Sequence, residues 1–69
     1  METESLKFLV RNEIGDADVQ RIERAMKKVD ADASVSVDVA SRTVAIESWL
    51  MPEEFIVAFT DENLDAKIV

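Results

Sequence analysis

The chain has 69 residues, which is the size of one domain, and we expect residues 1–69 to fold as a single unit. A hydrophobic content of 48% is ordinary for a globular protein and disfavours disorder. The net charge of −7 disfavours general binding to nucleic acids or to anionic lipid. Cysteine and histidine are both absent, which removes disulfides, thiolate catalysis and the two side chains that dominate zinc, copper and iron sites.

The N-terminal residues are acidic and polar, and they lack the basic start and the apolar stretch of a signal peptide. The sequence also lacks a run of about 20 apolar residues, the length that a transmembrane helix needs. We therefore expect a cytoplasmic protein without membrane insertion.

A strand with one buried face is predicted at residues 6–11, where Leu6, Phe8 and Val10 alternate with other side chains. A loop is expected at residues 12–15. Gly15 is the only glycine of the chain and the residue expected to adopt a positive φ.

An amphipathic helix is predicted at residues 16–29, because apolar side chains recur there at spacings of three and four. Acidic residues begin this segment and lysines end it, which suits the helix dipole. Asp16 is the expected N-cap.

Two further strands are predicted at residues 34–39 and 43–47, where β-branched residues alternate with polar ones. The link at residues 40–42 is too short for a crossover, so these strands should form an antiparallel hairpin.

A second helix is expected to begin at Pro52, because proline suits the first helical position, and to end within residues 60–63. Met51 precedes it and is a poor cap, which should cost on the order of 1 kcal/mol relative to serine or aspartate. A last strand is predicted at residues 66–69. The apolar stripe of the second predicted helix consists of Phe55, Ile56 and Phe59.

The predicted order is therefore βαββαβ, an α+β fold. Right-handed crossovers after the first and third strands place both helices on one face of a four-stranded antiparallel sheet. No linker or second domain is indicated by the sequence.

Three segments resemble a known family, the heavy-metal-associated domains of copper chaperones and metal-pumping ATPases. Residues 19–29 resemble the first helix of the family, which typically reads V-x-x-I-E-x-A-L-x-x-L. Residues 33–38 and 43–46 resemble its second and third strands, and residues 52–56 resemble its second helix. The resemblance implies a ferredoxin-like sandwich.

The resemblance does not extend to the metal motif. In the family, the loop after the first strand reads G-M-x-C-x-x-C, and its two thiolates hold Cu(I) or Zn(II). Here Asn12 and Glu13 stand at the Gly-Met pair, Gly15 at the first cysteine and Asp18 at the second. Because Cu(I) prefers sulfur donors, we expect no bound cofactor.

Three carboxylates around this loop leave two interpretations open. Glu13, Asp16 and Asp18 could form a site for a hard divalent cation such as Ca²⁺, Mg²⁺ or Mn²⁺. Acidic residues are also favoured at the start of a helix without any metal, where they cap it and complement its dipole.

A docking surface for another protein is the leading functional hypothesis. Half of the basic residues lie on the first predicted helix, which in the family contacts partner domains, so an acidic domain of a metal-transport ATPase is a candidate partner. The same side chains could instead be a solvated helix face. Trp49 could likewise be an exposed anchor or cover the edge of the core. The candidate docking residues are Arg21, Arg24, Lys28 and Trp49.

Catalysis finds little support in the sequence. Histidine, cysteine and tyrosine are absent, so that general-base chemistry would fall to carboxylates or a lysine. No glycine-rich phosphate loop is present. We expect a protein that is not an enzyme.

Overall fold

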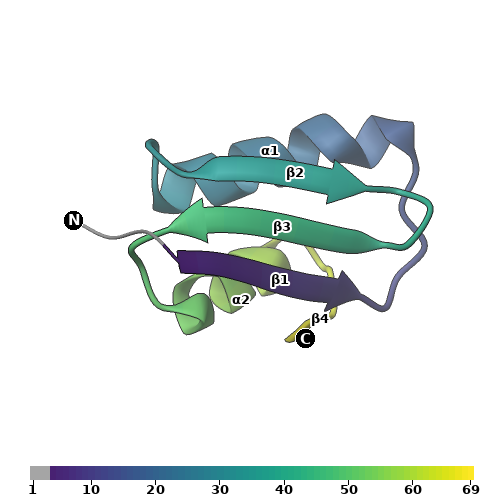
Figure 1. Cartoon of the computed structure of the whole chain (residues 1–69). Coiled ribbons are helices and arrows are strands. Elements are labelled where there is room, and N and C mark those ends of the chain that lie inside the picture. The colour runs from purple at the N-terminus through teal and green to yellow at the C-terminus, as the bar shows by residue number, and fades with distance from the viewer. Residues whose placement is uncertain (1–3) are drawn as a thin grey trace.

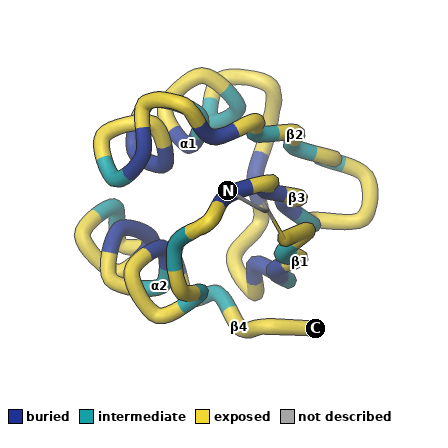
Figure 2. Tube along the Cα trace, turned by 60° about the vertical axis from the view of Figure 1, so that its left-hand side comes forward, coloured by how far each residue is buried: buried dark blue, intermediate teal, exposed yellow. Residues whose placement is uncertain are grey.

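The fold is a four-stranded antiparallel sheet with both helices on one of its faces (Figures 1 and 2). The computed structural model describes residues 4–69. The sheet order is β2-β3-β1-β4, which confirms the predicted ferredoxin-like sandwich. In chain order, the elements are β1 (Glu4–Val10), α1 (Asp16–Val29), β2 (Ser34–Asp38), β3 (Thr43–Ser48), α2 (Pro52–Asp61) and β4 (Ala66–Ile68).

The core lies between the sheet and the two helices. Phe8 on the central strand β1 is wholly buried, and its ring centroid lies 6.3 Å from that of Phe55 and 5.4 Å from that of Phe59. Both of these phenylalanines are wholly buried too, and so are Val10, Ile22, Met26, Val44 and Ile46, as the strand and helix periodicities predict. Figure 2 shows the buried segments on the facing sides of the helices and the sheet.

Within residues 4–69, neither helix combines the length and the apolar character that a membrane crossing requires.

The start of α1 differs from the prediction. Gly15, and not Asp16, is the N-cap residue, and Asp16 is the first helical residue. Asp18 in the first turn accepts a hydrogen bond from the Gly15 N–H at 2.9 Å, which satisfies a backbone donor just outside the helix. Asp16 lies one position after the N-cap residue, whereas Asp18 lies three positions after Gly15 and can bond back to the Gly15 N–H.

The prediction of a positive φ at Gly15 was also wrong, because its φ is −121°. Positive φ values occur instead at Arg42 (56°) and Asn63 (60°), which lie in the turn after β2 and in the turn after α2. The first of these turns is held by Asp38, whose Oδ1 accepts hydrogen bonds from the N–H groups of Ala40 at 3.1 Å and Ser41 at 3.4 Å.

A buried polar cluster joins the end of α1 to the end of β3. The Ser48 hydroxyl donates to Asp30 Oδ2 at 2.7 Å, and the Asp32 N–H donates to Asp30 Oδ1 at 3.0 Å. The Leu50 N–H in turn donates to Ser48 Oγ at 3.1 Å. Asp30 and Ser48 are the buried polar residues of the described chain. They bond to each other, and each also accepts a hydrogen bond from a nearby backbone N–H group.

Replacing Ile22 by alanine should lower the free energy of unfolding by about 2–5 kcal/mol, since it removes a wholly buried side chain from a small core. Urea denaturation monitored by circular dichroism measures this change. Val57→Ala is the matched control on α2, where the side chain is 61% exposed and its loss should change stability little. Equal stability of the two variants would contradict the packing of α1 described above.

Replacing Ser48 by alanine should cost about 1–3 kcal/mol, because it leaves the buried Asp30 carboxylate without its hydroxyl donor. Thermal unfolding of this variant should be compared with that of Ser5→Ala, which removes an exposed hydroxyl from β1. A Ser48→Ala protein as stable as Ser5→Ala would show that the buried cluster contributes nothing.

Candidate functional site

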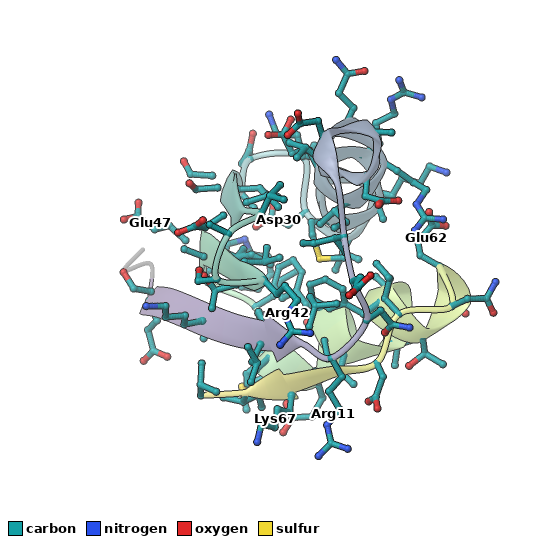
Figure 3. All side chains as sticks on the ribbon, turned by 90° about the vertical axis from the view of Figure 1, so that its right-hand side faces the viewer. Arg11, Asp30, Arg42, Glu47, Glu62 and Lys67 are labelled. Carbon is teal, nitrogen blue, oxygen red and sulfur yellow. The ribbon has the colours of Figure 1, made fainter. Side chains whose placement is uncertain are left out.

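The loop between β1 and α1 is held against the opposite connection, between α2 and β4. The Arg11 N–H donates to the Asp65 carbonyl at 2.7 Å, and the Asp65 N–H donates to Asn12 Oδ1 at 2.7 Å. Ile14 is buried and anchors the loop in the core. Figure 3 looks onto this end of the molecule, where Arg42 also donates to the Arg11 carbonyl at 3.3 Å.

The two positions at which the family has thiolates contact each other directly in this chain. The Gly15 N–H donates to Asp18 Oδ2, while Asp18 Oδ1 lies 3.2 Å from the Arg21 guanidinium. Both carboxylate oxygens are therefore engaged, and Gly15 has no side chain to offer. This donor set does not fit a soft metal, because a carboxylate is a poor ligand for Cu(I).

The three candidate carboxylates are not brought together as a hard-cation site. Within the described part of the chain, no group of three or more histidine, cysteine, aspartate or glutamate residues could hold a metal ion. Glu13 lines a shallow hollow beside Val39 and Arg42, whereas Asp18 bonds to Gly15 and Arg21. Asp16 lies exposed in the first turn of α1. The geometry therefore lends no support to the divalent-metal alternative.

A groove of about 380 Å³ runs between α1 and α2, and three of the predicted docking residues line it together. Its apolar residues come from both helices, and its two walls carry opposite charges. The α1 wall consists of Arg21, Arg24, Ala25, Lys28 and Val29, and the α2 wall of Ala58, Asp61 and Glu62.

The basic residues of the groove differ in their ion pairs. Arg21 pairs with Asp18 at 3.2 Å and reaches across to Glu62 on the α2 side at 3.7 Å (Glu62 is labelled in Figure 3). Among residues 4–69, neither Arg24 nor Lys28 forms a salt bridge within 4 Å. These two side chains are thus the cations of the groove that an incoming acidic group could pair with.

The acidic wall was missed in the sequence analysis. Asp61 and the C-cap residue Glu62 follow Ala58 by three and four positions, so that the three lie on one side of the C-terminal end of α2. The available signal was the charge of the segment, because residues 52–62 contain acidic residues and no basic one. Only the packing of the two helices side by side turns this composition into one wall of a groove.

Trp49, the fourth candidate, lies outside the groove. It follows Ser48 in the connection from β3 to α2, at the end of the sheet opposite to the loop at residues 12–15. Trp49 is 55% exposed, and nearby Met51 is 64% exposed. Leu50 between them packs against the core. Trp49 therefore lies on a different part of the surface from the three basic residues.

A scan against protein-family models and a search of curated proteins gave no significant match. Solved structures, in contrast, match closely. A gold binding protein has a TM-score of 0.87 and 20% identity, over 93% of this chain and 98% of that one. The copper chaperone Atx1 from Synechocystis PCC6803 has a TM-score of 0.81 and 26% identity, over 88% and 97%. The N-terminal domain of ZntA in its apo-form has a TM-score of 0.86 and 12% identity, over 99% and 94%.

These likenesses confirm the expected resemblance at the level of the fold. The chain has the architecture of small metal-binding and metal-chaperone domains, and it is matched over nearly its full length. It contains no cysteine, so the Cys-x-x-Cys motif of the resembling family is missing. The chain therefore has the fold of these domains without the thiolate ligands.

The double substitution Gly15→Cys with Asp18→Cys should create a soft-metal site. An added Cβ at Gly15 meets no atom within 4 Å, and the backbone there has a φ that any residue adopts. We expect tight binding of one equivalent of Cu(I), because two thiolates would flank the start of α1. Competition with a chromophoric Cu(I) chelator measures the affinity.

The matched control is Gly15→Ser with Asp18→Ser, which loses the same hydrogen bond from the Gly15 N–H to the Asp18 carboxylate but supplies no sulfur. If the folded double-cysteine variant bound Cu(I) no better than this control, the register of the loop against the family motif would be wrong.

Proposed function

We propose that this chain is a protein-docking module of a metal-transport pathway. It acts in the cytoplasm without a bound cofactor and without catalysing a reaction. Its α1 face meets an acidic surface of a partner protein. The observation that carries this proposal is the pair of basic side chains, Arg24 and Lys28, on one wall of the groove without an ion pair among the described residues.

The fold supports a place in metal handling. Its solved neighbours include a copper chaperone and the N-terminal domains of ZntA and PacS. In the family that the sequence resembles, the first helix and its preceding loop contact partner domains. This chain has that helix and that loop as well-packed elements, although it lacks the thiolates. The surface that contacts partners in the family is therefore present here without the metal ligands.

The groove has the composition of a small docking site. Ala25, Val29 and Ala58 provide apolar surface between the helices, and the charges stand around it. Charged groups at the rim of an interface act mainly on the association rate and on the choice of partner, and their effect weakens with salt. An acidic partner would therefore be selected by the α1 wall and held by contact with the apolar residues.

The three basic residues should not contribute equally. Arg21 is already held by Asp18 and Glu62, so its charge is largely balanced within the chain. Arg24 and Lys28 have no such partner among residues 4–69. We therefore assign the partner contact to Arg24 and Lys28, and the positioning of the α1 wall against α2 to Arg21.

Reversing the charge of Arg24 should weaken partner binding by about tenfold or more, because a rim charge that attracted the partner would now repel it. The test titrates Arg24→Glu and the parent chain with the soluble domains of metal-transport ATPases from the same genome, using calorimetry. Binding of the parent should also weaken as salt rises from about 0.05 M to about 0.5 M.

Lys67→Glu is the matched control, because it makes the same charge change at an exposed residue of β4, away from the helix layer. The proposal fails if none of these acidic domains binds, if Arg24→Glu and Lys67→Glu bind alike, or if salt leaves the affinity unchanged.

A further inference from the structure

The two edges of the sheet differ in how well they are protected. The edge strand β4 has only three residues, Ala66–Ile68, and carries a lysine at its centre. The edge strand β2 has five residues, Ser34–Asp38, with no proline, no lysine and no arginine. Natural proteins usually shield an edge with such residues, because exposed N–H and C=O groups of a strand can pair with another chain.

Strand β2 pairs on one side only. Its residues are in register with β3 from Ser34 opposite Glu47 to Asp38 opposite Thr43. On its other side, no strand of the described chain pairs with it, and Figure 1 shows it as the outermost strand with α1 behind it. One row of backbone hydrogen-bonding groups on β2 is therefore available in the plane of the sheet.

We propose that β2 pairs with β2 of a second copy of this chain, antiparallel about a two-fold axis through Ser36. The sheets of the two copies then form one continuous sheet. This register places Ser36 opposite Ser36 of the second copy, Val35 opposite Val37, and Ser34 opposite Asp38. Such an interface uses the same patch on both copies, which is the usual form of a homodimer.

The side chains of β2 suit a second copy because their pattern is nearly symmetric about Ser36. Val35 and Val37 are half-buried on the helix side, and each would gain the other as a cross-strand neighbour. Ser34 and Asp38 are exposed on the open face, where a serine hydroxyl can donate to the carboxylate. Asp38 uses Oδ1 for its own turn, and within residues 4–69 its Oδ2 accepts no hydrogen bond.

The strength of this association follows from its size and charge. Stable interfaces bury roughly 1,200–2,000 Å² in total, and a five-residue edge pairing falls short of this, so the dimer should be weak and dependent on concentration. Each copy carries a net charge of −7, and the resulting repulsion is screened by salt. Added salt should therefore strengthen self-association, whereas it should weaken the docking of an acidic partner on α1.

Disulfide trapping of a single introduced cysteine tests the proposal directly, because the chain has no other thiol. Residues opposite each other in an antiparallel pair have Cα atoms about 4.5–5.5 Å apart, within the range that a disulfide spans. Ser36 is exposed, so Ser36→Cys should leave the fold unchanged. We expect it to form a covalent dimer under mild oxidation, at least about tenfold faster than a random encounter of exposed thiols allows.

Ala45→Cys is the control for random encounter. Ala45 is also exposed on the open face and lies directly beside Ser36, but on the inner strand β3. In the proposed dimer, the two copies of residue 45 are separated by both β2 strands, at about three strand spacings or roughly 14 Å, which a disulfide cannot bridge. Ala45→Cys should therefore cross-link only slowly.

The register is tested with a mixture of Ser34→Cys and Asp38→Cys chains, which should form the mixed disulfide faster than either variant alone forms its own dimer. Equal rates for Ser36→Cys and Ala45→Cys would overturn the dimer. Faster cross-linking of Ser34→Cys alone than of the mixture would overturn the antiparallel register. Sedimentation of the parent chain at increasing salt provides the cysteine-free measurement, and a monomer at every salt and protein concentration would also overturn the proposal.

Discussion

Contact between Phe8 and the second helix is the packing interaction on which the rest of this structure depends. Phe8 occupies the central strand, and its ring lies close to those of Phe55 and Phe59, which places α2 over β1. Ile22 and Met26 hold α1 over the same core. Because both helices must bury their apolar stripes on one face of the sheet, they lie side by side. The groove and its two oppositely charged walls follow from that packing.

The loop before α1 shows how the scaffold persists without metal ligands. Thiolates are not needed to order it, since Asn12 bonds to the α2–β4 connection, Ile14 is buried, and Asp18 bonds to the Gly15 N–H. At the two positions where the resembling family has thiolates, this chain has a hydrogen bond between a backbone N–H and a carboxylate. The same bond holds the negative charge of Asp18 in the first turn of α1, where it interacts favourably with the helix dipole.

The two surfaces considered for partners lie on different parts of the molecule. The groove belongs to the helix layer and opens away from the sheet, whereas the edge of β2 lies in the plane of the sheet. A second copy at the edge would therefore leave the residues of the groove, such as Arg24 and Lys28, available to another protein. Salt should act on the two proposed contacts in opposite directions, because one would join opposite charges and the other two copies of like net charge.

The sequence by itself determined the six elements, their order and most of the core, because the periods of strand and helix are local properties of the chain. It also determined that no thiolate site exists. Only the tertiary structure decided that Gly15 is the N-cap and bonds to Asp18, that Asp30 meets Ser48, and that the acidic end of α2 faces the basic residues of α1. The last two pairings join segments far apart in the chain, and the first depends on where the backbone enters the helix, so that no local pattern specifies them.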